Sequence, residues 1–204
     1  MGCLKSKNKN NSNNEKNNPQ LKIHSTTNKE LESKIIFLGD AGVGKSSIVQ
    51  RFCNDKFQDK YDTTIGGAFF QKKITLKDNK SIKLQIWDTS GEEKFRNMIH
   101  LYFNGAQGAI FTYDVTNLES MEKLDHWINT LKENCDKNEM ILCLAGNKCD
   151  MDNNQRKVSY GKGKEFANAN NLIFFETSAK MDIGVKELFK TMAQKLYDKL
   201  SKEN

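Results

Sequence analysis

Residues 35–47 constrain the fold of this chain more than any other stretch. The apolar run from Ile35 to Leu38 is too short for a helix and ends in a glycine-bounded turn, after which apolar residues recur at helical spacing. The turn fits the pattern G-x-x-x-x-G-K-[ST], in which backbone N–H groups and the start of a helix bind phosphate oxygens. The pattern predicts that Lys45 reaches the terminal phosphates and that Ser46 ligates Mg²⁺. The alternative is an ordinary glycine-rich turn between a strand and a helix.

The length and the charge limit what else the chain contains. Its 204 residues suffice for one well-buried α/β domain and a tail. The formal net charge is +6, and half of it comes from residues 1–33, where six lysines outnumber three glutamates. Because the remainder is only mildly basic, we expect no nucleic-acid partner.

The cysteines indicate a protein with reduced thiols, and the apolar runs indicate that it does not span a membrane. The five cysteines show no C-x-x-C spacing, which is typical of ordinary reduced thiols in the cytosol. No apolar run approaches the roughly 18 residues of a membrane span, and no apolar core follows the N-terminus. Any membrane attachment is therefore expected to be peripheral.

The first nine residues match M-G-x-x-x-[ST], the signal for a myristoyl group on Gly2. One myristoyl chain holds a protein on membranes only marginally, with an association constant on the order of 10⁴ M⁻¹, so a second signal is expected. Palmitate on Cys3 or the nearby lysines could supply it. The alternative is a Met-Gly start without significance. Residues 8–33, rich in Asn and Lys, are predicted to form a flexible spacer, so 1–33 is an N-terminal segment and 34–200 the folded domain, with a short polar tail at 201–204.

Beyond the glycine-rich loop, strands and helices alternate. A helix is expected to run to about Cys53, and the segment around Lys77 and Lys80 reads as the turn of a hairpin. The expected strands are 68–76, 81–87, 109–115, 140–145 and 172–176, and the expected helices are 118–134, 159–170 and 183–200. This alternation predicts a mostly parallel sheet covered on both faces by helices.

Polar residues follow three of these strands. Asp88 ends a buried strand before a glycine-containing loop, where P-loop enzymes need a carboxylate on the Mg²⁺ side. Asn147-Lys148-Cys149-Asp150 follows another strand, and the carboxylate of Asp150 can accept hydrogen bonds from guanine N1–H and its exocyclic amine. Ser178-Ala179-Lys180 follows a third. Each motif is weak alone, but all lie at carboxyl ends of strands, where open α/β sheets bind ligands.

Together these motifs resemble those of the Ras-like small GTPases. Gly39–Ser46, Thr64, Asp88–Gly91, Asn147–Asp150 and Ser178–Lys180 occur in the order of the five nucleotide-binding motifs of that superfamily. The resemblance implies a three-layer P-loop fold with a six-stranded sheet, one antiparallel strand and about five helices.

Within the superfamily the chain is similar to Rab proteins. Trp87-Asp88-Thr89 and Lys94-Phe95-Arg96 resemble the Rab switch region, and Thr64 to Phe69 resembles the effector segment of the early-endosomal Rab-five branch. This similarity implies a monomeric GTP/GDP switch with an exchange factor, a GTPase-activating protein and effectors. It would act on the cytoplasmic face of endosomal or plasma membranes.

The resemblance also assigns roles to residues. Thr64 would close onto Mg²⁺ and the γ-phosphate, Asp88 would hold Mg²⁺ through water, and the Gly91 N–H would contact the γ-phosphate. Ala179 would donate its N–H to the guanine carbonyl. The nucleotide-binding residues implied are Ala41, Gly42, Val43, Gly44, Lys45, Ser46, Ser47, Phe57, Tyr61, Thr64, Gly91, Asn147, Lys148, Asp150, Ser178, Ala179 and Lys180. The implied effector surface is Ile65, Gly66, Phe69, Trp87 and Tyr102, although Phe69, Trp87 and Tyr102 could equally be ordinary core residues.

Two features depart from the family pattern. Rabs usually end in prenylated cysteines, but no cysteine follows Cys149, so we expect the N-terminal acyl groups to take that role, as in an unusual group of endosomal Rabs. Glu92 stands where the family has the glutamine that orients the attacking water. Its charge near the γ-phosphate would cost about 4 kcal/mol at about 4 Å with an effective dielectric constant near 20, which predicts slow intrinsic hydrolysis.

Two other functions compete with the switch. A P-loop kinase or ATPase would need an acceptor site or a lid and would leave Asn147–Asp150 and Ser178–Lys180 unexplained. A membrane scaffold that stays loaded with GTP because of Glu92 would need no turnover. Nucleotide selectivity decides the first alternative, and the nucleotide extracted from the purified protein decides the second.

Overall fold

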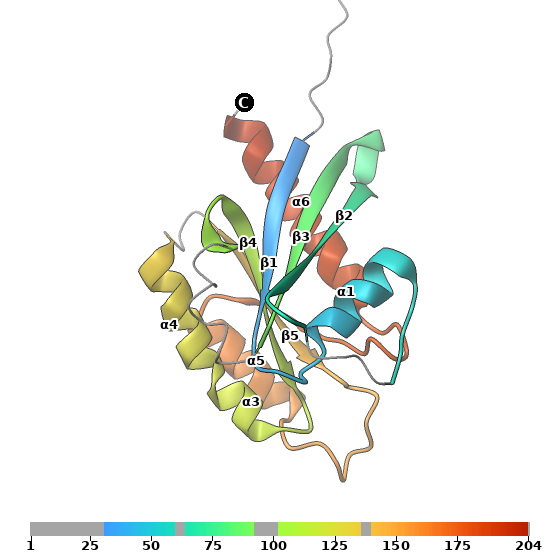
Figure 1. Ribbon diagram of the computed structural model, residues 1–204, viewed down its shortest axis with the longest axis vertical. Coiled ribbons are helices and arrows are strands. Elements are labelled where there is room, and N and C mark those ends of the chain that lie inside the picture. The colour runs from blue at the N-terminus through green and yellow to red at the C-terminus, as the bar shows by residue number, and fades with distance from the viewer. Residues whose placement is uncertain (1–30, 60–63, 92–101, 136–139, 204) are drawn as a thin grey trace, which may run out of the picture.

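The structure is a computed structural model that describes residues 31–59, 64–91, 102–135 and 140–203. Its centre is a six-stranded sheet in the order β2-β3-β1-β4-β5-β6 (Figure 1). The strands are β1 (Leu31–Leu38), β2 (Gly67–Thr75), β3 (Ser81–Thr89), β4 (Ala106–Asp114), β5 (Ile141–Asn147) and β6 (Ile173–Glu176). Only β2 runs antiparallel to its neighbour, and the other pairs are parallel. The predicted sheet is therefore confirmed.

The described residues also form five α-helices and one short 3-10 turn. The helices are α1 (Lys45–Asn54), α3 (Leu118–Glu122), α4 (Leu124–Asn134), α5 (Tyr160–Ala169) and α6 (Val185–Glu203), and the turn η1 (Lys77–Asn79) joins β2 to β3. Side-chain caps start two helices: Asn117 accepts a hydrogen bond from the Ser120 N–H, and Ser159 accepts one from Lys162. Among the described residues, no helix is long and apolar enough to cross a bilayer.

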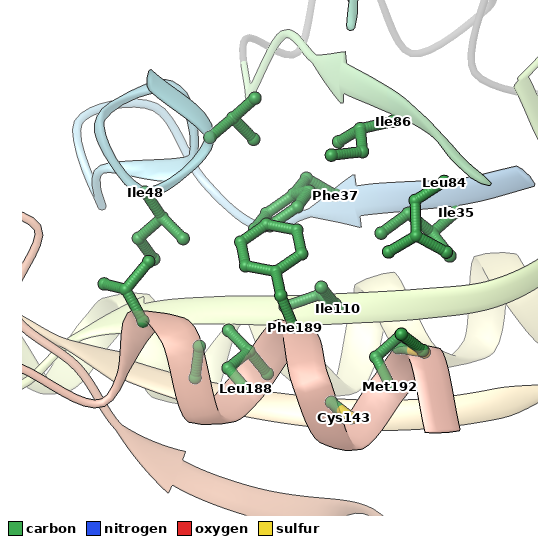
Figure 2. Packing of buried hydrophobic residues seen from close by; sticks show 14 of the residues in the cluster. Ile35, Phe37, Ile48, Leu84, Ile86, Ile110, Cys143, Leu188, Phe189 and Met192 are labelled. Atoms are coloured by element: carbon green, nitrogen blue, oxygen red, sulfur yellow. The ribbon is translucent and has the colours of Figure 1, made fainter. Parts of the chain in front are cut away.

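Two apolar clusters, one on each face of the sheet, make the three layers. One cluster joins α1 and α6 to the sheet, with Phe189 of α6 beside Phe37 of β1 (Figure 2). The ring of Phe189 also stacks on Phe52 of α1, with centroids 3.7 Å apart and planes 8° from parallel. The other cluster lies under α3, α4 and α5, where Trp127 is almost fully buried. Because β1 is covered on both faces, its residues Ile35 to Leu38 have no exposed surface.

The elements differ from the sequence-based expectations mainly at their ends. β1 begins at Leu31, because Leu31 already pairs with Ile82 of β3, so the sheet starts inside the segment predicted to be a spacer. At the other end, α6 continues to Glu203, through most of the predicted polar tail. The helix expected at 118–134 is divided at Lys123 into α3 and α4, since the His126 N–H bonds the Lys123 carbonyl three residues back and tightens the turn.

Candidate functional site

A cavity of about 640 Å³ opens at the carboxyl end of the sheet. The loops after β1, β3, β5 and β6 contribute to its wall, as expected for a parallel sheet whose carboxyl ends share one edge. Its lining residues are Ala41, Gly42, Gly44, Lys45, Ser46, Ser47, Phe57, Gln58, Asp59, Thr64, Thr89, Gly91, Asn147, Lys148, Asp150, Met151, Ala179 and Lys180. The structure thus brings together most of the nucleotide-binding residues predicted from the sequence.

The glycine-rich loop follows β1 and leads directly into α1. Gly44, the residue before the helix, has a φ of +96°, which a residue with a side chain rarely adopts. A Cβ atom there would overlap the side-chain nitrogen of Asn147. At the start of the loop, a Cβ on Gly39 would overlap the carbonyl oxygen of Thr112. Both glycines are therefore needed for the close approach of neighbouring strands and loops.

Lys45 folds back over the loop that precedes it. Its Nζ donates to the carbonyl oxygens of Gly39 at 2.6 Å and Asp40 at 2.8 Å, and only 5% of the residue is exposed. Burial lowers the pKa of Lys45 to about 8, against the opposing effect of the carboxylates of Asp88 and Asp40. A buried ammonium group at the cavity wall is suited to an anionic ligand.

Three oxygen-bearing side chains meet near Lys45. The hydroxyl oxygens of Ser46 and Thr64 are 2.9 Å apart. Asp88 is buried, and its Oδ1 has no hydrogen-bond partner among the described residues. Burial raises the pKa of Asp88, while the hydrogen bond with Ser46 and the charge of Lys45 lower it. Two hydroxyls and a carboxylate with a free oxygen fit a hard cation such as Mg²⁺.

Gly91 closes the cavity wall above the glycine-rich loop. A Cβ atom on Gly91 would overlap the backbone of Asp40 and Ala41. The residues directly after β3 therefore lie against the loop that precedes Lys45, and Gly91 lines the cavity together with Lys45. Only glycine allows this approach.

Asn147, the last residue of β5, connects the two ends of the cavity. Its Nδ2 donates to the carbonyl oxygen of Val43 at 2.9 Å. Its Oδ1 accepts from the hydroxyl of Thr177 at 3.3 Å and from the N–H of Ala179 at 3.4 Å. The buried amide thus joins the glycine-rich loop to the loop after β6. Val43 takes part through its carbonyl and is not on the cavity wall.

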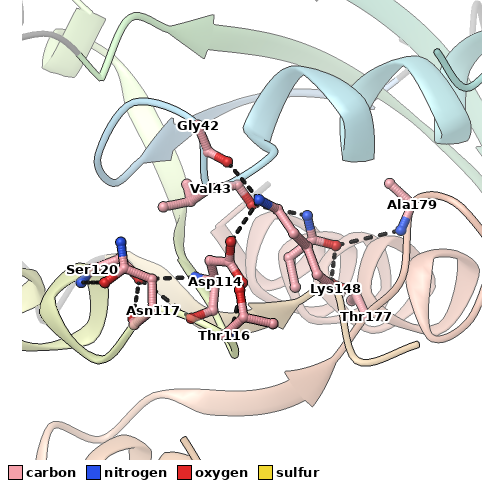
Figure 3. Close-up of polar contacts among 10 residues, drawn as sticks. Gly42, Val43, Asp114, Thr116, Asn117, Ser120, Lys148, Thr177 and Ala179 are labelled. Carbon is pink, nitrogen blue, oxygen red and sulfur yellow. Dashed lines mark hydrogen bonds and ion pairs between the residues drawn. The ribbon is translucent and has the colours of Figure 1, made fainter. Parts of the chain in front are cut away.

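The side chain of Lys148 runs along the glycine-rich loop. Its Nζ donates to the Gly42 carbonyl at 2.9 Å and is 2.5 Å from Oδ2 of Asp114 (Figure 3). The other oxygen of Asp114 accepts from the N–H and the hydroxyl of Thr116. The sequence predicted Lys148 as a site residue but not Asp114, whose only signal was its place at the end of a buried strand.

The remaining predicted residues have different positions. Phe57, Asp150 and Lys180 line the cavity. Ser178 does not, because it is fully buried and its hydroxyl accepts the Met181 N–H at 2.9 Å, which holds the loop in shape. The predictions for Gly2, Cys3, Tyr61 and Glu92 lie outside the described residues.

Two further contacts at the site could not be read from single motifs. Asp40 accepts a hydrogen bond from the indole nitrogen of Trp127 at 3.0 Å and lies 3.2 Å from the ammonium of Lys123. Arg51 of α1 donates to the carbonyl of Ala179 at 2.8 Å. These partners are 87, 83 and 128 residues apart in the chain, and nothing in the sequence marks them as neighbours.

Three aromatic rings form a chain beside the cavity, from β2 across β3. The centroid of Phe69 is 5.1 Å from that of Trp87, which is 5.5 Å from that of Tyr102. Phe69 is 48% exposed and the neighbouring Ile65 is 82% exposed. Trp87 and Tyr102 are half-buried and also contact the apolar cluster under α3, α4 and α5, so these two rings serve as core as well as surface.

Comparison with known proteins gives the family. Residues 34–198 match the Ras family. The chain belongs to this family of small GTPases. It is 41% identical over 166 residues to GTP-binding protein ypt5 of Schizosaccharomyces pombe, covering 81% of this chain and 78% of that protein.

Other relatives are Rab proteins. Ras-related protein Rab-17 of Mus musculus is 42% identical over 164 residues, covering 80% of this chain and 75% of Rab-17. Ras-related protein RABF2a of Arabidopsis thaliana is 40% identical over 172 residues, covering 84% of each chain. The small GTPase is therefore of Rab type. It binds GTP, GDP and Mg²⁺, hydrolyses GTP and regulates membrane trafficking.

Proposed function

We propose that this Rab-type GTPase is a GTP/GDP switch in endosomal membrane trafficking, held on the cytoplasmic face of its membrane by an acylated N-terminus. The observation that carries the switch is a single cavity with Lys45, Ser46 and Thr64 at one end and Asp150 and Ala179 at the other. This arrangement offers cationic and cation-binding groups to a polyphosphate and a carboxylate with a backbone N–H to a base.

In the proposed complex, the phosphates lie over the backbone N–H groups from Ala41 to Ser47, and Lys45 turns toward the terminal phosphates. Phe57 and the stems of Lys148 and Lys180 flank the base, and Tyr61, which lies outside the described residues, is proposed as a further nucleotide-binding residue. Asp150 accepts from the guanine N1–H and its amine, and Ala179 donates to the 6-oxo group. A carboxylate cannot bond adenine in this way, so the site selects guanine.

Ser46 and Thr64 would ligate Mg²⁺ directly, and Asp88 would do so through water. When held there, Mg²⁺ would supply positive charge that stabilises the charge developing on the phosphates during transfer. The unpartnered oxygen of buried Asp88 supports this assignment, because a buried carboxylate oxygen is usually bonded. Water attacks the γ-phosphorus in line while the bond from that phosphorus to the β,γ-bridging oxygen breaks, which gives GDP, inorganic phosphate and a proton released to solvent. Lys45 stabilises the developing charge, and no covalent intermediate forms.

The gain or loss of the γ-phosphate is proposed to change the conformation of residues 57–69 and 89–103. Thr64 and Gly91 lie on the cavity wall, one at each of these segments, so both can contact the last phosphate. Ile65, the residue after Thr64, and Phe69 of β2 have exposed side chains. We propose that they and Gly66, Trp87 and Tyr102 form the effector surface of a monomeric protein that also meets an exchange factor and a GTPase-activating protein.

The base assignment has a direct test. Asp150→Asn replaces an acceptor with an amide that can donate to the 2-oxo group of xanthine, so the variant should prefer XDP while the wild type prefers GDP. Competition against a fluorescent GDP measures both preferences, with ATP and ADP as further competitors. Asp152→Asn, at an exposed position two residues away, is the matched control and should keep the wild-type preference. A wild type that bound ADP as tightly as GDP would refute the assignment.

Glu92 is proposed to slow intrinsic hydrolysis, because glutamate lacks the amide donor of glutamine and adds a negative charge near the γ-phosphate. Single-turnover hydrolysis should be faster in Glu92→Gln than in the wild type. The neighbouring Glu93→Gln is the control and should be unchanged. Equal rates for the wild type and Glu92→Gln would end this part of the proposal.

A second candidate function follows from the same residue. If Glu92 abolishes turnover, the protein is a GTP-loaded membrane scaffold. Nucleotide extracted from the purified protein separates the two, since GDP indicates the cycling switch and predominantly GTP indicates the scaffold.

The anchor is proposed to be myristate on Gly2 with palmitate on Cys3, supported by the N-terminal signal Met-Gly-Cys-Leu-Lys-Ser. Gly2→Ala should release the protein from membranes, and Cys3→Ser should weaken its retention. Imaging of both variants beside the wild type also identifies the organelle. A Gly2→Ala protein that stays on membranes would refute the anchor.

A further inference from the structure

Arg51 lies on α1, six residues after Lys45, and reaches the opposite end of the cavity. Its Nε donates to the Ala179 carbonyl at 2.8 Å, and its Nη2 donates to the Lys180 carbonyl at 3.3 Å. Its side chain is only 15% exposed. The helix that carries Lys45 and Ser46 is therefore bonded directly to the loop after β6.

The third nitrogen of the guanidinium group is also engaged. Nη1 donates to the backbone oxygen of Asp55 at 3.2 Å and to its Oδ1 at 3.0 Å. Asp55 ends α1 with a left-handed backbone and has an 82% exposed side chain. Because the guanidinium group is planar and rigid, bonds on both of its sides fix the orientation of the whole fork. Lysine, with a single nitrogen, cannot make this set of bonds.

The loop that Arg51 holds also has bonds of its own. Ser178 and Ile183 form an antiparallel bridge, and the Ser178 hydroxyl accepts the Met181 N–H. Neither Ser178 nor Ile183 lines the cavity. On the cavity side, the N–H of Ala179 is directed at Oδ1 of Asn147 at 3.4 Å, a long bond that leaves this N–H available to a stronger acceptor.

We propose that Arg51 is a positioning residue that sets the backbone of Ala179 and Lys180 against the guanine base. This role rests on the proposed function, because it explains how Ala179 and Lys180 are held in place for their proposed contacts with the base. Through Arg51, the position of the base loop follows the position of the helix that carries the phosphate-binding Lys45. The phosphate end and the base end of the nucleotide are thereby held in register.

The expected effect of losing Arg51 is faster nucleotide release, mainly because the bond between the Ala179 N–H and the 6-oxo group of the base is weakened. In Arg51→Lys, we expect GDP to dissociate about tenfold faster, which corresponds to about 1.4 kcal/mol. The diphosphate of 2-aminopurine riboside keeps the 2-amine and the phosphates but lacks the 6-oxo group and the N1–H, so it loses the proposed bond to the Ala179 N–H and one of the two proposed bonds to Asp150. Its release should quicken less than threefold, because it makes no bond to the Ala179 N–H.

The experiment measures the release of each nucleotide from the full chain after excess unlabelled GDP is added. Asp55→Asn is the matched control, since it weakens the exposed ion pair of Arg51 and leaves both carbonyl bonds in place; its release rates should stay within twofold of the wild type. Arg51→Gln, which keeps one planar amide donor, should fall between the wild type and Arg51→Lys.

Each other outcome has one meaning. Unchanged GDP release in Arg51→Lys, an equal acceleration for both nucleotides, or the same acceleration in Asp55→Asn would overturn the positioning role. Loss of folding in both Arg51 variants would also overturn it, because Arg51 would then support the fold as a whole. A wild type that released the two nucleotides equally fast would refute the proposed base contact itself, which is a separate failure.

Discussion

Nucleotide binding should draw a proton from solution at mildly alkaline pH, because the carboxylates of Asp88 and Asp40 only partly offset the cost of burying the charge of Lys45. In the structure its Nζ contacts two carbonyl oxygens, and burial lowers its pKa from 10.5 to about 8. The difference corresponds to about 3 kcal/mol that the folded protein loses by keeping this lysine charged. A polyphosphate placed beside Lys45 adds negative charge next to its ammonium group, which should restore the pKa of Lys45 to at least its ordinary value.

The size and the sign of the effect follow from these values. At pH 8 about half of the Lys45 side chains are uncharged in the free protein, and at pH 9 about nine-tenths are. GDP binding should therefore take up about 0.5 proton at pH 8 and about 0.9 at pH 9. Since the unfolded chain holds this proton more tightly between pH 8 and 10.5, Lys45 also makes the free protein more stable as the pH rises through that window.

Titration calorimetry in two buffers of different ionisation enthalpy measures the proton uptake at each pH. Cys149 is another ionisable group near the site, and burial, with Glu176 and Asp150 nearby, raises its pKa above the ordinary value of a thiol. Cys149→Ser should leave the uptake unchanged. Uptake below about 0.2 proton at pH 9, or its disappearance in Cys149→Ser, would refute the reasoning about Lys45.

Three further predictions concern the surroundings of the cavity. Gly44→Ala places a Cβ atom on the side chain of Asn147, so GDP affinity measured by competition should fall at least about tenfold, and unchanged affinity would contradict the clash. Trp127→Phe removes the indole donor to the Asp40 carboxylate and should cost about 1.5 kcal/mol of unfolding free energy in urea with saturating GDP; a cost near zero would show that this bond contributes nothing. Phe189→Ala removes the ring stacked on α1 and should cost about 3–5 kcal/mol in the same assay, and a loss below about 1 kcal/mol would contradict its place in the core.

The sequence predicts this fold well where local chemistry decides the structure. The glycine-rich loop, the hairpin around Lys77 and the buried strands are each specified by neighbouring residues, and the structure contains all of them. The ends of the elements were harder, since β4 begins at Ala106 through pairing with Lys34 of another strand. The turn that separates α3 from α4 at Lys123 is likewise not marked by glycine or proline.

The residues of the site that could be predicted are those that belong to a short sequence motif with a known role. Lys45, Ser46 and Asp150 belong to such motifs, and all three line the cavity. Arg51 and Asp114 act by contacting motif residues that are far away in the chain, and a single sequence carries no signal for pairs of this kind. Such partners become visible only when tertiary structure brings the segments together.

The double attachment of Asn147 has a consequence for how the switch is emptied. One buried amide holds the loop before α1 with its nitrogen and the loop after β6 with its oxygen. A rotation of that single side chain would break its bonds to both loops at once, so the contacts with the phosphates and with the base would weaken together. Exchange would then be a concerted release, which a partner would trigger by displacing either loop without entering the cavity.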